Sequence, residues 1–437
     1  MTRPESIADH AAIDFGTSNS ALAMTVGHQK VELVALEAGW TTMPTAVFYR
    51  ADPDLPGADP VALFGRAALA AYVEGHEGRL MRSMKSILGS TLVDQATDVG
   101  AGRSVRYLDV IAGYLRHLRQ IAERRAGAPV RRVVLGRPVF FVDDDAARDA
   151  QAAAALTAAA RQVGFDEVGF QYEPIAAAFA YEAGVTAETL VLVADIGGGT
   201  SDFSLLRVGP RRRARLERQD DILANHGVHV AGTDFDRRLE LAAILPLAGL
   251  GALGPAAPGQ AAREVPSGLY HDLATWHLIN TCYTPSRVAE WRRMRGWFAE
   301  PALHRRLMRV LDGRLGHGLA AAAEQAKIDV ALQGRAEIDL GSLERGLASR
   351  LDSGPAAAAI DGDLDRIVAA AVQTVRLAGV PAKDVQALYF TGGSTGLAPL
   401  VERIGAAFPN AERVRGDRFA SVATGLGLHA QRLFSGA

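Results

Sequence analysis

The sequence has 437 residues, of which 49% are hydrophobic and 22% are charged, a balance typical of globular proteins. A chain of this length exceeds one compact core, so we expect at least two domains. The net charge of −2 excludes a strong field that would recruit nucleic acid or an anionic membrane. Cys282 is the single cysteine, which excludes an internal disulfide and a zinc site built from cysteines.

The amino-terminal segment MTRPESIADH lacks the basic and apolar regions of a secretory signal. The longest apolar stretch, residues 241–258, is interrupted by proline and glycine and is too short between them to span a bilayer. We therefore expect a cytoplasmic protein with no membrane segment and no nucleic-acid partner.

Short β-type runs and amphipathic helices alternate along the first part of the chain. The pattern predicts strands at 12–15, 21–26, 31–35, 46–49 and 131–138, helices at 61–75, 108–125 and 143–164, and a brief strand followed by a helix within 169–184. The same alternation therefore indicates an α/β protein.

The plan repeats from residue 190. Strands are predicted at 190–195, 203–208, 336–340 and 387–391, and helices from about 233, over most of 271–330, at 364–378 and at 419–433. Residues 248–270 are rich in glycine, alanine and proline and are predicted to form a long loop. The chain thus divides into two α/β halves.

Each half begins with a glycine-rich turn of nearly the same pattern, AIDFGTSNSALAM at 12–24 and VADIGGGTSDFSLL at 193–206. Glycine lets the backbone approach a ligand closely, and the N–H groups and hydroxyls of such a turn suit phosphate oxygens. The sequence therefore predicts two phosphate-binding turns. The expected binding residues are Gly16, Thr17 and Ser18 in the first turn and Gly197, Gly198, Gly199 and Thr200 in the second.

Asp14 and Asp195 lie at the strand ends that lead into these turns. A carboxylate beside bound phosphate is repelled unless a cation intervenes, and Mg²⁺ binds one or two carboxylates together with water and phosphate oxygens. An ordinary β-hairpin whose aspartate caps backbone amides is the alternative for either turn alone, but two such turns in one chain disfavour it. We expect Asp14 and Asp195 to flank a magnesium site.

Six segments together resemble the actin-like ATPase superfamily and, within it, the seventy-kilodalton heat-shock chaperones, the DnaK family. These segments are IDFGTSNS, YEPIAAAFAYE, DIGGGTSDFSLL, AGTDFDRRL, EQAK and TGGST. QYEPIAAAFAYE and EQAKIDVAL look most like the YegD-type branch of short DnaK relatives. The resemblance extends from about residue 11 to 431 and is weakest over 241–315.

The resemblance implies an α/β, actin-like (ribonuclease H-like) ATPase fold of two lobes, each with a mixed sheet flanked by helices. A nucleotide cleft would lie between the lobes. Lobe I would comprise residues 1–186 and 419–437, and lobe II residues 187–418, with an expanded helical and loop subdomain at about 241–330.

The resemblance also implies catalytic roles. Thr17 would touch phosphate and Thr200 would face the γ-phosphate of ATP. Glu173 would orient the attacking water, and Lys85, within MKSILGS, would neutralise charge on the transferring phosphoryl group. The expected catalytic residues are thus Lys85, Glu173, Asp195 and Thr200.

On the nucleoside side, Glu324 and Lys327 lie one helical turn apart and resemble the family pair that contacts ribose and adenine, although this spacing also fits an exposed ion pair. Two glycine turns also resemble adenosine-binding segments: Gly392, Gly393 and Ser394 in one, and Gly232 and Thr233 in the other.

Three positions depart from the family pattern. Ile328 and Gly396 stand where two arginines would stack on adenine, which puts base selectivity in question. Phe140 replaces a hinge tyrosine and lacks its hydroxyl.

The resemblance implies a molecular switch that binds ATP and Mg²⁺ and hydrolyses ATP slowly. The alternative is a nucleotide-sensing scaffold with negligible turnover that regulates a partner. Because the sequence ends soon after the last predicted helix, we expect no peptide-binding domain, and the region 241–315 is the expected surface for a protein partner. A metabolite kinase of the same superfamily is disfavoured, because no motif for a sugar-facing aspartate is evident.

Overall fold

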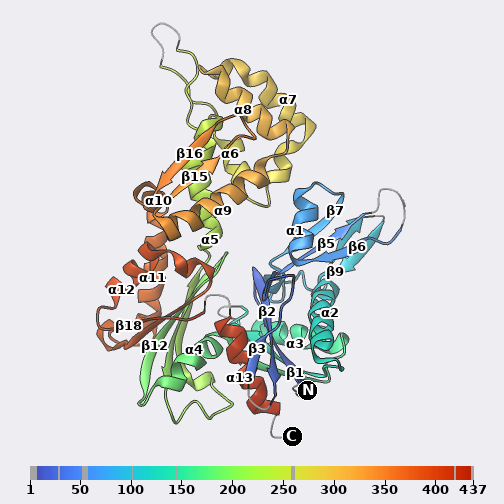
Figure 1. Ribbon diagram of the computed structural model, residues 1–437, viewed down its shortest axis with the longest axis vertical. Coiled ribbons are helices and arrows are strands. Elements are labelled where there is room, and N and C mark those ends of the chain that lie inside the picture. The colour runs from blue at the N-terminus through green and yellow to red at the C-terminus, as the bar shows by residue number, and fades with distance from the viewer. Residues whose placement is uncertain are drawn as a thin grey trace, which may run out of the picture.

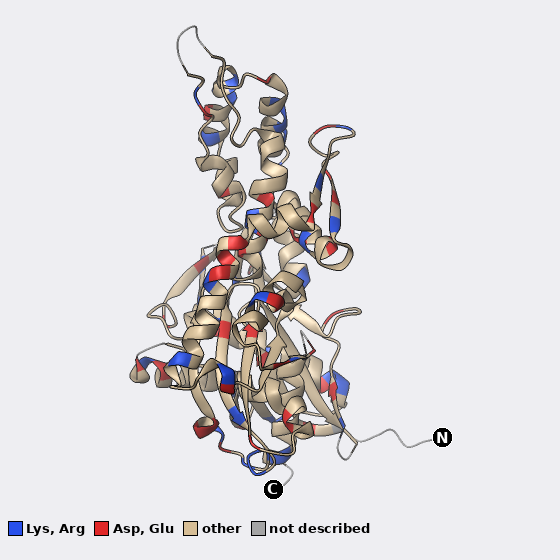
Figure 2. Cartoon of the chain, turned by 90° about the vertical axis from the view of Figure 1, so that its left-hand side faces the viewer, with Lys and Arg blue, Asp and Glu red and all other residues tan. Residues whose placement is uncertain are grey.

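The computed structural model describes residues 7–27, 30–51, 58–100, 102–142, 145–256, 261–417 and 420–434. Two mixed β-sheets form the lower half of the molecule, and a smaller assembly extends upward from each of them (Figure 1). Acidic and basic residues are interspersed over both halves (Figure 2), in keeping with the low net charge.

The first sheet has the strand order β11-β10-β1-β2-β3, with β4 paired to β2. Its central strand β1 is antiparallel to β2 and parallel to β10. β2 and β3 are antiparallel, and β10 and β11 are parallel. The strands are β1 (Ile7–Phe15), β2 (Asn19–Val26), β3 (Lys30–Leu33), β4 (Thr42–Pro44), β10 (Arg132–Arg137) and β11 (Glu167–Tyr172).

The second sheet repeats this topology in the order β14-β13-β12-β17-β18. Its central strand β12 is antiparallel to β13 and parallel to β17, as β1 is to β2 and β10. The repeated sequence pattern therefore reflects a repeated fold. The strands are β12 (Thr189–Ile196), β13 (Ser201–Val208), β14 (Ile222–Val228), β17 (Ala387–Thr391) and β18 (Glu412–Arg415).

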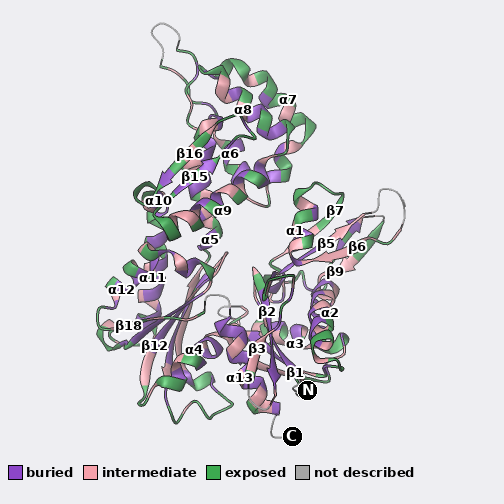
Figure 3. Cartoon of the chain, in the orientation of Figure 1, coloured by how far each residue is buried: buried purple, intermediate pink, exposed green. Residues whose placement is uncertain are grey.

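Helices cover the outer face of each sheet and bury its apolar side chains (Figure 3). α2 (Tyr107–Ala126) and α3 (Ala146–Gln162) pack with the first sheet, and α11 (Asp361–Leu377) and α12 (Ala398–Ala407) with the second. In α2 the apolar residues recur every three or four positions, so one face of the helix is buried. The helix ends at Gly127, whose φ of 68° is the left-handed conformation that glycine favours at such ends.

A third core joins the two sheets. It contains residues of both sheets together with α4 (Glu173–Gly184) and α13 (Ser421–Phe434). Where these helices meet, a Cβ atom added to Gly425 would lie 2.0 Å from the carbonyl oxygen of Ala176, so only glycine permits this contact. The two halves are thus joined at their base by direct helix packing.

We propose the division into lobe I (1–186 with 419–437) and lobe II (187–418). Every strand of the first sheet precedes residue 187, every strand of the second sheet lies within 187–418, and α13 returns to pack on β1, β2 and β10. Residues 1–6, 418–419 and 435–437 lie outside the described residues, as do Asp143 and Phe419, where two of the predicted helices begin.

The upper part of lobe I contains a three-stranded sheet, a helix and a hairpin. They are β5 (Ala46–Arg50), β6 (Val61–Phe64), β7 (Gly78–Arg82), α1 (Gly65–Val73), β8 (Ala96–Gly100) and β9 (Arg103–Arg106). The predicted helix at 61–75 is wrong for its first four residues, which pair with β5 as strand β6. Gly65, at a φ of 61°, separates the strand from the helix.

The upper part of lobe II is mostly helical, as predicted for 271–330. Its elements are α5 (Gly232–Leu239), a π-helical turn (Glu240–Ile244), α6 (Gly268–Leu273), α7 (Pro285–Arg293), α8 (Pro301–Asp312), α9 (Gly316–Gln333), β15 (Arg335–Asp339), β16 (Ala348–Asp352) and α10 (Ser353–Ala359). The loop predicted at 248–270 ends where α6 begins, and its residues 257–260 are outside the described part. None of the helices in the described ranges is both long and apolar enough to cross a membrane.

Candidate functional site

Both glycine-rich turns are tight connections between the first two strands of a sheet. β1 and β2 pair Asp14 with Ala21, and β12 and β13 pair Asp195 with Asp202. In the first turn, a Cβ on Gly16 would lie 2.2 Å from the carbonyl oxygen of Asn19, so glycine is required there. In the second, the backbone N–H of Gly197 donates to the carbonyl of Thr200 at 3.0 Å.

The two turns face each other. A Cβ added to Gly198 would lie 2.9 Å from Oγ of Ser18, so the second turn lies directly against the first. The neighbouring Gly199 would place its Cβ within 4 Å of no other protein atom, which leaves open space beside it. The predicted phosphate-binding turns are therefore brought together across the two sheets.

Lys85 and Glu173 join this arrangement from different elements. Lys85 lies in a 3-10 turn (Met84–Ile87) that follows the left-handed residue Ser83, and Glu173 is the first residue of α4. Nζ of Lys85 donates a hydrogen bond to Oε1 of Glu173, and the lysine side chain is only 8% exposed. The two predicted catalytic residues therefore form an ion pair.

Burial beside other carboxylates raises the pKa of both aspartates. Burial raises the pKa of Asp14 to about 8, and Glu173 and Asp195 add to the rise while Lys85 opposes it. Burial likewise raises the pKa of Asp195 to about 7, with further contributions from Asp202 and Glu173. Burial lowers the pKa of Lys85, but Glu173 and Asp14 more than offset this, so the pKa of Lys85 is raised overall.

The donor chemistry at this point fits Mg²⁺. Asp14 and Asp195 are buried beside other carboxylates, and Lys85 alone opposes the rise of their pKa values. A divalent cation would supply the missing positive charge and stabilise both carboxylates in the ionised form. Within the described ranges, no three His, Cys, Asp or Glu side chains are grouped to hold a metal by themselves. Mg²⁺ takes one or two carboxylates and completes its shell with water and phosphate oxygens.

The predicted nucleoside-side residues gather at the second turn. The carbonyl of Gly197 accepts hydrogen bonds from Oγ of Ser394 at 2.7 Å and from the backbone N–H of Gly232 at 3.2 Å. Thr233 donates to the carbonyl of Gly198 through both its backbone N–H and its hydroxyl, each at 2.8 Å. These two segments therefore continue the phosphate-binding turn on one side.

Gly392 is held against the same turn. A Cβ there would lie 2.4 Å from the carbonyl oxygen of Ile196 and 2.7 Å from Oδ1 of Asp195, at a φ of 87°. Gly393 follows as an exposed residue that begins the 3-10 turn Gly393–Gly396. Glycine is thus needed where this loop approaches the Asp195 carboxylate.

Lys327 and Glu324 on α9 have different surroundings. Nζ of Lys327 contacts Oδ1 of Asp236 at 2.7 Å and donates to the carbonyl of Gly232 at 3.2 Å. Burial raises the pKa of Asp236 to about 6, although Lys327 opposes the rise. Glu324 is exposed, so the ion pair of Lys327 is with Asp236 and not with its neighbour on the helix.

Sequence reasoning assigned no role to Asp202 or Asp236, although both lie within quoted motifs. Asp202 is opposite Asp195 in the hairpin, and Asp236 is the second aspartate of TDFD. Two of the residues that depart from the family pattern are exposed to solvent, Ile328 at 41% and Phe140 at 51%. Thr17 and Thr200 are half-buried within their turns.

A cluster of aromatic and basic side chains links the upper parts of the two lobes. The guanidinium of Arg82 on β7 lies 4.2 Å from the ring centroid of Trp276, and Tyr72 of α1 stacks on the same tryptophan at 5.1 Å. His317 of α9 packs against both rings and its Nε2 is 3.2 Å from Oδ1 of Asn280. We call Tyr72, Arg82, Trp276 and His317 the interlobe cluster.

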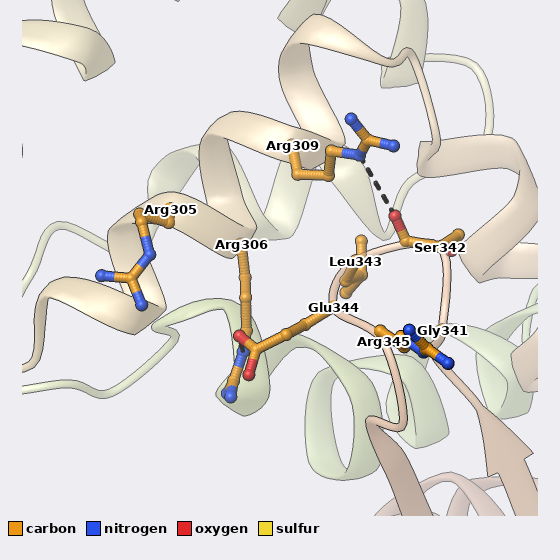
Figure 4. A pocket seen from close by; sticks show the side chains of 8 residues that line it. All are labelled: Arg305, Arg306, Arg309, Gly341, Ser342, Leu343, Glu344 and Arg345. Atoms are coloured by element: carbon orange, nitrogen blue, oxygen red, sulfur yellow. Dashed lines mark hydrogen bonds and ion pairs between the residues drawn. The ribbon is translucent and has the colours of Figure 1, made fainter.

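Two further hollows lie in lobe II, away from the glycine turns. One, of about 500 Å³, lies between α8 and the β15–β16 turn and is lined largely by arginines (Figure 4). The other, of about 690 Å³, lies between β14 and α11 and has a mostly apolar lining.

Comparison with known proteins places this geometry in a family. The sequence model of the family described as "Hsp70 protein" matches residues 11–242, which contain both glycine turns, Lys85 and Glu173. The chain belongs to the Hsp70 family. Its fold is accordingly that of the actin-like Hsp70 ATPase domain, as predicted from the sequence.

Curated Hsp70 relatives match over half of this chain. A chaperone protein HscA homolog of Aromatoleum aromaticum is 32% identical over an alignment of 244 residues that covers 52% of this chain and 36% of the relative. The chaperone proteins DnaK of Thermosipho melanesiensis and Thermotoga maritima are each 30% identical, covering 52% of this chain and 34% of each relative. The match thus spans about a third of the length of these relatives.

Proposed function

We propose that the chain binds Mg-ATP between the two glycine turns and hydrolyses it slowly, as a nucleotide-dependent switch of the Hsp70 kind. The observation that carries this proposal is the convergence of Asp14, Lys85, Glu173 and Asp195, four charged residues far apart in the sequence, beside two facing glycine turns. A triphosphate is the ligand that such a pair of turns suits, because each turn offers backbone N–H groups and hydroxyls.

The proposed roles follow from charge and position. Lys85 carries the positive charge nearest the carboxylates and would stabilise negative charge on the transferring phosphoryl group. Glu173, which already accepts a hydrogen bond from Lys85, would orient the attacking water. The Thr17 and Thr200 hydroxyls would hold phosphate oxygens from opposite turns.

Asp14 and Asp195 would hold Mg²⁺, chiefly through its water ligands, and the ion would neutralise charge on the phosphates. Both carboxylates must be ionised to do so, and their raised pKa values mean that cation binding would release protons.

The nucleoside would lie beside Gly232, Ser394 and Lys327, with Glu324 at the exposed edge. Ile328 and Gly396 offer no guanidinium for stacking, so we propose that adenine is held less selectively than a site with two stacking arginines would hold it. The affinity for GTP should therefore be closer to that for ATP than in such a site.

The second candidate is a nucleotide-sensing scaffold with negligible turnover. Region 241–315 is the proposed partner surface in either case, because it forms the expanded helical part of lobe II. Assignment to the YegD-type branch and a cytoplasmic location stay predictions from the sequence.

Calorimetric titration with ATP, ADP and GTP in the presence of Mg²⁺ tests the shared premise, and phosphate release separates the two candidates. We expect ATP to bind, and the Asp195→Asn variant to lose phosphate release. The exposed Asp384→Asn variant, in the turn that precedes β17, is the matched control. Absence of binding by all three nucleotides would refute the proposal. If ATP binds but the parent chain releases phosphate no faster than Asp195→Asn, the protein is the nucleotide-sensing scaffold and not an ATPase.

A further inference from the structure

The hollow between α8 and the β15–β16 turn has an unusual concentration of positive charge. Four arginines line it, Arg305, Arg306 and Arg309 from α8 and Arg345 from the turn, and Glu344 is the one acidic lining residue (Figure 4). The chain as a whole has a net charge of −2, so this positive field is local. We call these four side chains the arginine groove.

Among the four arginines, Glu344 forms an ion pair with Arg306 only. Nε of Arg306 donates to Oε2 of Glu344 at 2.8 Å, and this hydrogen bond lowers the pKa of Glu344. Arg309 donates to the backbone carbonyl of Ser342 at 3.3 Å. Within the described ranges, Arg305, Arg309 and Arg345 form no ion pair, so three guanidinium groups lack a carboxylate partner.

The two walls of the groove are fixed before any ligand arrives. α8 buries its opposite face, including Leu307, Val310 and Leu311, which directs its arginines outward. On the other wall, Leu343 is buried and the turn is closed by a hydrogen bond from the backbone N–H of Leu340 to the carbonyl of Leu347 at 2.9 Å. Prearranged walls reduce the ordering cost of binding.

We propose that the arginine groove binds an acidic peptide segment of a protein partner. A guanidinium group pairs with a carboxylate through two parallel hydrogen bonds, and three guanidinium groups without a carboxylate partner on two walls suit several successive Asp or Glu side chains. A nucleic-acid strand is disfavoured, because none of the lining residues is aromatic and the groove is a single hollow of about 500 Å³.

The groove is separate from the proposed nucleotide site. Its residues belong to α8 and to the β15–β16 turn, whereas the glycine turns belong to the central sheets (Figure 1). Part of it lies within region 241–315, so it gives that surface a specific ligand chemistry. Because peptide binding there needs no nucleotide, its test is independent of the proposed function.

The test uses the full chain and a fluorescein-labelled oligoglutamate peptide, with binding followed by fluorescence anisotropy without added nucleotide. We expect saturable binding that weakens as salt is added. The double variant Arg305→Glu/Arg345→Glu should weaken binding by about tenfold or more, because both side chains are exposed and reversing them turns attraction into repulsion.

The matched control is Arg124→Glu/Arg161→Glu, which changes the net charge equally at exposed arginines of α2 and α3. We expect this control to bind the peptide within about twofold of the parent chain. Absence of binding by the parent chain, or equal weakening in both double variants, would overturn the proposal. A single-stranded oligouridylate that binds the groove as tightly as the peptide would also overturn it.

Discussion

Lys85 donates a hydrogen bond to Glu173, although 88 residues separate them in the sequence. The pair lies beside Asp14 and Asp195, so one buried cation faces three carboxylates. Removing the lysine takes away the positive charge closest to the place proposed for phosphoryl transfer. We therefore expect Lys85→Ala to lower the rate of phosphate release from ATP by about 100- to 1,000-fold. Single-turnover hydrolysis with purified protein measures this rate.

Lys383→Ala provides the control, since this lysine is exposed and lies far from the glycine turns in the fold. Its phosphate release should equal that of the parent chain. Lys85→Ala with parental turnover would contradict the role assigned to the lysine.

Glu173→Gln should lower kcat more than it weakens ATP binding, because the proposed role of Glu173 concerns the attacking water.

The contact between Arg82 and Trp276 should stabilise the link between the lobes. A cation over an indole ring contributes about 0.5 to 2 kcal/mol, depending on burial. Urea unfolding of Arg82→Ala, Trp276→Ala and the double variant should therefore give a coupling free energy in that range. Arg82 and the exposed Trp297 serve as a reference pair, because no cation–ring contact joins them in the described part of the chain, and their coupling should be near zero. If the Arg82–Trp276 coupling is no larger than that of the reference pair, the contact between Arg82 and Trp276 does not form in solution.

Glu240 should make stability depend on pH. Burial raises its pKa from 4.5 to about 8, Asp236 adds to the rise, and Oε1 of Glu240 has no hydrogen-bond partner among the described residues. The folded state thus keeps a proton that the unfolded state releases, so this group lowers the free energy of unfolding as pH rises between these two values, by about 1.4 kcal/mol per pH unit.

Glu240→Gln is neutral at every pH and should remove this loss. Its free energy of unfolding relative to the parent chain should rise from about pH 5 to about pH 8. Thermal or urea unfolding across this range measures the difference, with exposed Glu402→Gln as the control. A difference that does not change with pH would mean that Glu240 is ionised in the folded protein.

Gly425 and Gly113 should respond oppositely to alanine. Both lie within helices, but a Cβ at Gly425 would lie 2.0 Å from a backbone oxygen, whereas a Cβ at Gly113 would meet nothing within 4 Å. We expect Gly425→Ala to lower the free energy of unfolding by at least about 2 kcal/mol. Gly113→Ala should raise it by about 0.5 to 1 kcal/mol, since alanine favours the helix. Equal effects of the two substitutions would show that the packing of α13 on α4 is looser than described.

Local pattern was enough to predict most of the elements that carry the site. Helices at 108–125 and 364–378 have apolar residues every three or four positions, and both glycine turns follow short apolar strands. The segment 61–75 was misassigned because an apolar run before Gly65 suits a strand and a helix equally well. Strands β14 and β18 were not predicted, because their pairing partners, and not their own residues, make them strands.

Relationships between distant segments could not be predicted from the sequence. The contact of Tyr72 with Trp276 joins elements on different lobes, and the local sequence around either residue gives no sign that the two side chains meet. The pairing of Lys327 with Asp236 also depends on how α9 packs against α5. Residue spacing identified Lys327 as a candidate, but only the fold identifies the carboxylate that holds it.

The position of α13 has a consequence for how the protein is made. This helix packs against β1, β2 and β10, so the core around the first strands is incomplete until residues 421–434 have been synthesised. At translation rates of about 5 to 20 residues per second, β11 would leave the ribosome roughly 10 to 50 s before α13. The nascent chain must therefore keep an apolar face of its first sheet uncovered through most of its synthesis, and a chaperone that binds nascent chains would have its target there.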